Sequence, residues 1–160
     1  MSDTFDPDHL RAELLPLSAS QAPSEEARAY QRFYGLNALG PDGSISSRIG
    51  RVEVGGYDIV TQWWMPDQPV GTLVLMHGFY DHVGLYRHVI DWALGLGLAV
   101  IACDLPGHGL SSGARASITD FAEYQAVLDR LFMEAESLNL PQPWHLCGQS
   151  TGGAIVIDHV

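Results

Sequence analysis

The chain has 160 residues, enough for one domain with a hydrophobic core, although single-domain α/β enzymes often run to about 200 residues or more. Hydrophobic residues make up 46% and charged residues 17% of the chain, a composition typical of a soluble globular protein. The formal net charge of −11 disfavours binding to nucleic acids and stable docking on anionic membranes, because like charges repel.

The start of the chain is acidic where a secretory signal has a basic region followed by an apolar stretch. The longest nearly apolar run, residues 94–103, is too short to span a bilayer. Cys103 and Cys147 lie in apolar, strand-like sequence, which indicates buried free thiols in a reducing compartment. We therefore expect a cytoplasmic protein without a transmembrane segment; the sequence does not indicate its oligomeric state.

Residues 1–45 are predicted to form an amino-terminal arm with a short helix, and its first part, up to about Ser24, is expected to be loosely held. The arm mixes proline, serine and acidic residues around a short apolar patch near Leu14. One short helix is expected within residues 24–39, because Ser24 can cap its start and acidic residues follow in the first turn.

An antiparallel pair of strands is predicted to open the second segment, residues 46–160. Its strands, residues 51–54 and 57–65, flank Gly55-Gly56, whose glycines can take positive φ. This two-residue spacing is typical of a hairpin.

Three short and wholly apolar runs follow, as expected for strands of a parallel sheet that is covered on both faces. The runs span residues 72–76, 98–103 and 144–147. Helical stretches are predicted between them, at residues 86–96 and at 118–138, the second with a cap at Ser117 to Asp120. This alternation predicts an α/β fold with a mostly parallel sheet and right-handed crossovers.

The pentapeptide Gly148-Gln149-Ser150-Thr151-Gly152 lies between the last apolar run and an apolar helix. A serine hydroxyl is a weak nucleophile and must face both a base and a substrate, so serine enzymes of this kind hold it on a tight strand-to-helix turn. Gly148 and Gly152 stand where larger side chains would collide with the strand and the helix. An ordinary glycine-rich turn is the alternative. The strand before it and the helix after it favour a nucleophile elbow with Ser150 as catalytic nucleophile.

A second loop, His77-Gly78-Phe79, follows the first apolar run. The tetrahedral intermediate of acyl transfer needs two preorganised backbone N–H donors at its oxygen. We assign these donors to Phe79 and Thr151, and expect Gly78 to let the loop turn toward Ser150. His77 is expected to position the loop by hydrogen bonds, with an ordinary strand-end histidine as the alternative.

The segment from Asp104 to Gly113 follows the second apolar run and is dense in turn-forming residues. We expect a rigid structural loop at the carboxyl edge of the sheet. Asp104 is predicted to accept hydrogen bonds from backbone N–H groups of its own loop, as aspartate commonly does.

The order and spacing of these motifs resemble the α/β-hydrolase superfamily, most closely its monoacylglycerol lipase and lysophospholipase-like branch, also grouped as serine aminopeptidase-like hydrolases. The matching motifs are His77-Gly78-Phe79-Tyr80-Asp81-His82, Asp104-Leu105-Pro106-Gly107-His108-Gly109-Leu110-Ser111 and Gly148-Gln149-Ser150-Thr151-Gly152-Gly153. The resemblance covers about residues 52–160. It implies that Ser150 is the nucleophile and that the N–H groups of Phe79 and Thr151 form the oxyanion hole. We expect a small, lipid-like ester substrate and neither a cofactor nor a metal ion.

The resemblance also implies an acid and a base that come after the serine along the chain. Asp158 and His159 lie on the helix that leaves the elbow, with backbones about 12–14 Å further along it, out of hydrogen-bond reach. The earlier histidines, His77, His82 and His108, do not stand at the position of the base. We therefore expect an amino-terminal fragment of a longer hydrolase, nearly inactive by itself, whose last strand is an exposed apolar edge that lowers solubility.

The predicted function is hydrolysis of carboxylic esters, of the monoacylglycerol or lysophospholipid type, through an acyl-Ser150 intermediate. Two alternatives stay open on the sequence. One is an acyltransferase that uses the same acyl-enzyme, and the other is a binding protein that keeps the fold without the chemistry.

Overall fold

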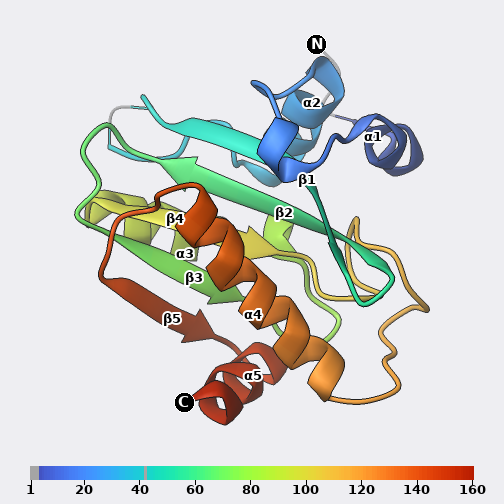
Figure 1. Ribbon diagram of the computed structural model, residues 1–160. Helices are drawn as coiled ribbons and strands as arrows, with labels where there is room; N and C mark the ends of the chain where they lie inside the picture. The colour runs from blue at the N-terminus through green and yellow to red at the C-terminus, as the bar shows by residue number, and fades with distance from the viewer. Residues whose placement is uncertain (1–3, 42) are drawn as a thin grey trace.

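The computed structural model describes residues 4–41 and 43–160. Its centre is a five-stranded sheet with the strand order β1-β2-β4-β3-β5 (Figure 1). The strands are β1 (Ser46–Val54), β2 (Tyr57–Met65), β3 (Gly71–Met76), β4 (Leu98–Cys103) and β5 (Trp144–Gly148). The β1–β2 and β2–β4 pairs are antiparallel, whereas β3 is parallel to both β4 and β5. The expected hairpin and parallel strands are thus present, in a mixed sheet.

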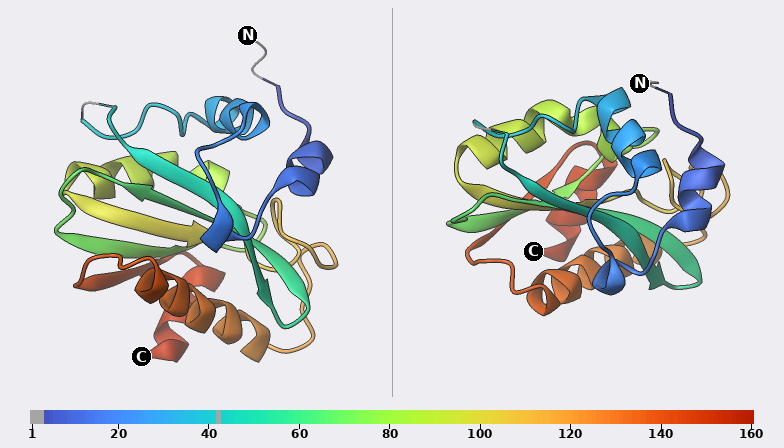
Figure 2. Two further views of the ribbon diagram at one scale, coloured as in Figure 1. Left: turned by 45° about the horizontal axis from the view of Figure 1, so that its top comes forward. Right: turned by 90° about the horizontal axis from the view of Figure 1, so that it is seen from above.

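Helices cover both faces of this sheet. Helices α2 and α3 lie over one face, and α4 and α5 over the other (Figure 1, Figure 2). The helices are α1 (Pro7–Glu13), α2 (Glu25–Tyr34), α3 (Arg87–Gly95), α4 (Ala122–Ser137) and α5 (Thr151–His159), with the 3-10 turns η1 (Leu17–Ala19) and η2 (Val83–Tyr86). Within the described residues, no helix is both long enough and apolar enough to cross a bilayer.

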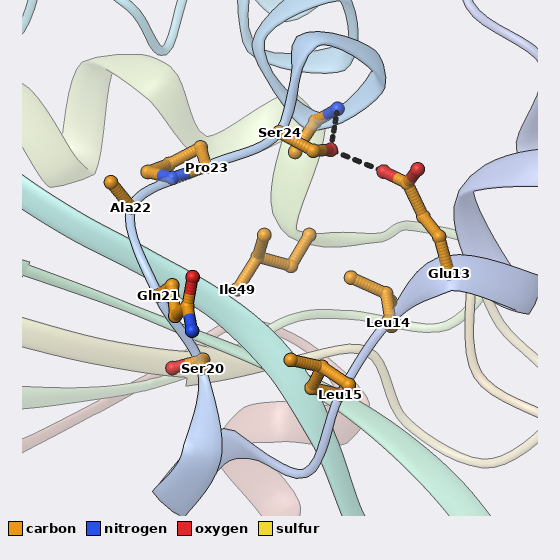
Figure 3. A pocket seen from close by; sticks show the side chains of 10 residues that line it. Glu13, Leu14, Leu15, Ser20, Gln21, Ala22, Pro23, Ser24 and Ile49 are labelled. Atoms are coloured by element: carbon orange, nitrogen blue, oxygen red, sulfur yellow. Dashed lines mark hydrogen bonds between the residues drawn. The ribbon is translucent and has the colours of Figure 1, made fainter.

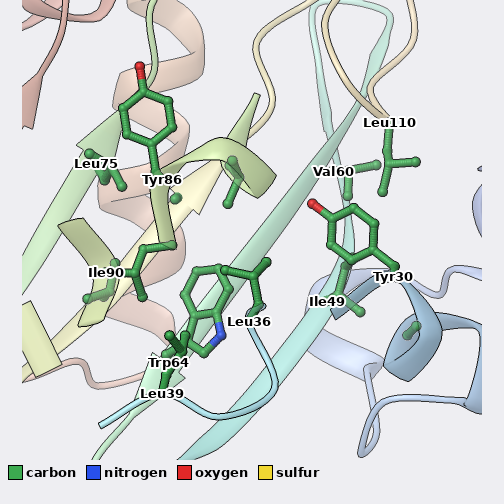
Figure 4. Packing of buried hydrophobic residues seen from close by; sticks show 14 of the residues in the cluster. Tyr30, Leu36, Leu39, Ile49, Val60, Trp64, Leu75, Tyr86, Ile90 and Leu110 are labelled. Carbon is green, nitrogen blue, oxygen red and sulfur yellow. The ribbon is translucent and has the colours of Figure 1, made fainter. Parts of the chain in front are cut away.

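The central strand β4 explains why the apolar runs lack alternation. Val100 and Ala102 belong to the core cluster beneath α2 and α3, where Trp64 and Tyr30 also pack (Figure 4). Ile101, between them in sequence, belongs to the cluster beneath α4 and α5. Successive side chains of a strand point to opposite faces, so a sheet with two covered faces needs apolar residues throughout.

Two helices begin or end at other residues than expected. Helix α2 ends at Tyr34 instead of near residue 39, because Gly35 takes a left-handed conformation, φ 72°, that closes the helix. Helix α4 begins at Ala122 instead of near residue 118. Asp120 accepts the N–H of Ala122, and Glu123 accepts the N–H of Asp120, so these side chains hold a turn before the helix.

The amino-terminal segment is packed against the sheet, in contrast to the loosely held arm expected from its composition. It contains α1 and η1 in addition to the expected helix, and Leu10 and Leu17 are buried. The η1 backbone lies on β1 so closely that a Cβ on Gly50 would come within 2.6 Å of Leu17 Cα. Arg51 of β1 donates its N–H to the Leu15 carbonyl at 2.9 Å.

A cavity of about 190 Å³ lies between this segment and β1 (Figure 3). Leu14, Leu15 and Ile49 give it apolar walls, and Ser24 donates a hydrogen bond to Glu13 across it. Because β1 and β5 form opposite edges of the sheet, this cavity lies far from the segment that follows β5.

The two cysteines are free, as expected. Cys103 is fully buried in β4, whereas Cys147 is only partly buried, because β5 forms an edge of the sheet. The edge position of the last strand agrees with the sequence expectation.

Candidate active site

Ser150 stands on the turn between β5 and α5. Its backbone has φ 53° and ψ −117°, and residues with side chains rarely adopt positive φ, because such sparsely populated conformations cost roughly 1–3 kcal/mol. The residue is exposed, and its hydroxyl makes no hydrogen bond to any residue that the structure describes. Strained backbone at an exposed polar residue is a feature of functional sites, where the surrounding fold imposes the conformation.

The glycines on either side of Ser150 are needed for space. A Cβ on Gly148 would lie 2.3 Å from the Gly152 carbonyl oxygen, and a Cβ on Gly152 would lie 2.1 Å from the Met76 carbonyl oxygen. Gly153 is different, since a Cβ there would be 3.3 Å from its nearest atom. The elbow thus brings α5 directly against the carboxyl ends of β3 and β5.

The loop after β3 touches the elbow. A Cβ on Gly78 would lie 3.3 Å from the Cβ of Ser150, so a larger residue here would press on the serine. Next to this contact, the N–H groups of Phe79 and Thr151 have no acceptor among residues 4–41 and 43–160. Two free backbone donors beside an exposed serine can stabilise an oxyanion.

Tyr86, which the sequence reasoning missed, joins the loop to the elbow. Its hydroxyl accepts the Gly78 N–H at 2.9 Å, and it lies 2.8 Å from Asp81 Oδ2 and 2.5 Å from Gln149 Oε1. A phenol has one proton, so Tyr86 donates to Asp81 or to Gln149 at any one time. Burial, together with the hydrogen bond to Asp81, raises the pKa of Tyr86 to about 12. The hydroxyl therefore stays protonated at neutral pH.

His77 joins the ends of β3 and β4. Its Nδ1 is 2.7 Å from the Gly78 carbonyl oxygen and must donate, and its Nε2 accepts the Leu105 N–H at 2.9 Å. Burial lowers the pKa of His77, although the negative charge of Asp104 acts in the opposite direction. The ring is therefore neutral, with both nitrogens engaged in positioning loops.

Asp104 is a structural residue, as predicted. It is fully buried, and its carboxylate accepts the Leu110 N–H of its own loop at 2.9 Å. It also accepts the Val83 N–H at 2.8 Å, a bond to η2 that the sequence did not suggest. A Cβ on Gly109 would lie 2.3 Å from the same carboxylate, which explains the glycine.

Two further histidines lie near the loops but do not bind Ser150. His82 Nδ1 accepts the Gly84 N–H at 3.2 Å and thereby caps η2. His108 Nδ1 donates to the Pro106 carbonyl at 2.9 Å, and its buried Nε2 has no partner within the described part of the chain.

The residues after the elbow point elsewhere. His159 Nδ1 lies 3.7 Å from Asp129 on α4, and Asp158 is exposed. Among the residues that the structure describes, no group of three or more histidine, cysteine or acidic side chains is arranged to hold a metal ion.

An elbow serine between a parallel strand and a helix, beside a His-Gly loop on the neighbouring strand, defines an α/β-hydrolase. The solved structure of a soluble variant of monoglyceride lipase from Saccharomyces cerevisiae, in complex with a substrate analogue, shares this fold. The TM-score is 0.56 at 20% identity, over 68% of this chain and 38% of that one.

Residues 67–160 match the family described as "Serine aminopeptidase, S33", and the chain belongs to this family. It is 39% identical over 107 residues to the monoacylglycerol lipase of Mycolicibacterium smegmatis, covering 66% of this chain and 38% of that protein. It is 34% identical over 109 residues to human monoglyceride lipase, covering 66% of this chain and 35% of that protein. The chain therefore spans little more than a third of the length of these two relatives.

Proposed function

We propose that this protein is a serine hydrolase that cleaves carboxylic esters of the monoacylglycerol or lysophospholipid type. The observation that carries the proposal is the exposed, strained Ser150 beside the two unpaired N–H groups of Phe79 and Thr151. The lipase names of its relatives support a lipid-like ester as the substrate.

In the proposed reaction, Ser150 Oγ attacks the ester carbonyl carbon while a general base takes the hydroxyl proton. The carbonyl oxygen becomes an oxyanion that the N–H groups of Phe79 and Thr151 stabilise, each typically by about 2.7–4 kcal/mol in the transition state. The tetrahedral intermediate then expels the alcohol, which receives the proton from the base. Water next attacks the acyl-Ser150 ester by the same steps and releases the carboxylic acid.

The general base is the part of this mechanism that the described histidines do not provide. His77 has both nitrogens engaged in loop contacts, His82 caps η2, His108 bonds Pro106 and not Ser150, and His159 faces α4. We therefore propose that the base and its orienting acid act from outside residues 1–160, so that these residues alone are nearly inactive.

A fluorophosphonate probe tests the nucleophile, since it forms a covalent bond with an activated serine. The full-length protein, which means residues 1–160 together with the part proposed to supply the base, should react with the probe. Its Ser150→Ala variant should not. Labelling that persists in Ser150→Ala would exclude Ser150 as the nucleophile. Absence of labelling in the unmodified full-length protein would favour a binding protein without the chemistry.

A product analysis separates hydrolysis from acyl transfer. The full-length protein is incubated with a monoacylglycerol, with and without an added primary alcohol. Free fatty acid should be the main product in both reactions. A new ester that dominates in the presence of the alcohol would favour an acyltransferase.

A further inference from the structure

The turn that carries Phe79 contains an unusual residue. The N–H of Asp81 donates to the Gly78 carbonyl at 3.1 Å, which closes a four-residue turn with Phe79 and Tyr80 in its centre. Tyr80 has φ 63°, and positive φ at the third residue of a turn marks type II, a position that strongly favours glycine. A tyrosine there therefore destabilises the fold.

Apart from its neighbour in the turn, Phe79, no described residue makes a ring contact with this tyrosine. The residue is 68% exposed, and its hydroxyl makes no hydrogen bond within the described residues. The Tyr80 ring packs on the Phe79 ring, at 4.2 Å between centroids, and Phe79 is itself 45% exposed. The pair is thus an aromatic surface open to solvent.

This aromatic pair has a fixed position beside the nucleophile. Gly78, which starts the turn, leaves too little room for a larger side chain beside Ser150 and donates its N–H to Tyr86. Asp81, which ends the turn, lies 2.8 Å from the same Tyr86 hydroxyl. Phe79 in addition contacts the His108 ring edge-on at 5.8 Å. The turn is thus held at both ends, and its rings project next to the oxyanion donors.

We propose that Tyr80 determines specificity: its ring, together with Phe79, contacts the apolar acyl chain of the ester bound at Ser150. The inference rests on the proposed esterase function. The acyl chain is the part of such a substrate that matches this surface, because the rings are apolar and the Tyr80 hydroxyl has no polar partner within the described residues. Each methylene group that the rings remove from water strengthens binding about fourfold.

The test compares the full-length protein with Tyr80→Gly on 4-nitrophenyl esters from acetate to laurate. Glycine relieves the positive φ, so the thermal midpoint should rise by about 2–4 °C. At the same time kcat/KM for laurate should fall about sixteenfold, corresponding to the loss of contact with two methylene groups, whereas the value for acetate should stay within about twofold. Tyr80→Phe keeps the ring and should retain the chain-length profile.

Met133→Ala serves as the control, because Met133 is an equally exposed apolar residue on α4. Its chain-length profile should match that of the unmodified protein. An equal loss on acetate and laurate in Tyr80→Gly, or no loss on laurate, would overturn the proposal. A lowered thermal midpoint would also overturn it, since the ring would then be packed against another part of the protein. Ser150→Ala tests the proposed function separately: if it hydrolyses all esters normally, Ser150 is not the nucleophile and the proposed serine-hydrolase mechanism fails whatever Tyr80 does.

Discussion

Two neighbouring glycines in the first turn of α5 have different surroundings, and alanine substitutions should separate them. In Gly152→Ala the new methyl group would meet the Met76 carbonyl oxygen at 2.1 Å, so β3 and α5 must move apart. We expect the free energy of unfolding to fall by about 3 kcal/mol or more, with loss of fluorophosphonate labelling. Gly153→Ala should change the free energy of unfolding by less than about 1 kcal/mol, because the nearest atom to the new methyl group is 3.3 Å away and alanine favours helix. An equal loss of unfolding free energy in the two variants, measured by urea denaturation, would contradict this difference in surroundings.

The Tyr86 hydroxyl should matter because it pairs a buried backbone donor. Tyr86→Phe leaves the Gly78 N–H without its acceptor, which should lower the free energy of unfolding by about 1–3 kcal/mol. It also releases the link to Gln149, so labelling of Ser150 should slow. Tyr34→Phe is the matched control, because the Tyr34 hydroxyl makes no hydrogen bond within the described residues. Urea denaturation of both variants gives the comparison, and an equal small loss in each would exclude the proposed role.

Residues of the site differ in how far the sequence reveals them. Ser150 and its glycines form one continuous motif, so their spacing alone predicts a tight turn. The contacts of Tyr86 instead join Gly78, Asp81 and Gln149, which lie in two distant segments. No local sequence pattern predicts these contacts, because they depend on how β3 and β5 pair in the sheet.

At the scale of elements, His77 links the ends of β3 and β4 and should make stability depend on pH. Its folded pKa is lowered by burial, so below about pH 6.5 the unfolded chain binds the proton more readily than the folded one. This contribution to stability is intact above about pH 6.5 and is lost as the pH falls below it. Urea midpoints should therefore decrease between about pH 7 and pH 5.5, and the decrease should be smaller in His77→Gln. An equal decrease in both proteins would assign the effect to other groups.

Buried strands were more predictable than the segments around them. The runs that became β3 and β4 are apolar on both faces, and a covered sheet leaves few alternatives. Helix ends depended on single side-chain contacts, as at Asp120. The packing of α1 and η1 was missed although Leu10, Leu14 and Leu17 have helical spacing, because the extended backbone at Leu14 and Pro16 divide this segment into short pieces.

Considered as a whole, the molecule uses its amino-terminal segment to support the loops of the candidate site. Arg11 of α1 donates to the carbonyls of Gly109 and Leu110, in the loop after β4. Tyr34 of α2 packs its ring on His82, at 4.9 Å, beside η2. The family match begins only at residue 67, so these supports lie in a part of the chain that it does not include.

The edge of the sheet formed by β5, opposite β1, should make the 160-residue chain associate with itself. No strand among the described residues pairs with the outer side of β5. Beside it lies an apolar groove of about 470 Å³, lined by Leu73, Trp92, Leu96, Leu98, His145, Leu146 and Cys147. Unpaired edges next to apolar surface favour pairing between chains. The net charge of −11 opposes association, so added salt, which screens it, should strengthen association.

Sedimentation velocity over a range of protein and salt concentrations measures this association. His145→Lys places a charge at the exposed edge and should shift the chain toward monomer. Met133→Lys makes the same substitution on α4, away from the edge, and should leave the association unchanged. Two results would contradict the edge as the contact: a monomeric chain at all concentrations, or an equal response to both lysines. At ordinary salt, two unit charges about 10 Å apart in water are already largely screened. The lysine at position 145 can therefore weaken only contacts close to β5, and the lysine at position 133 should not affect them.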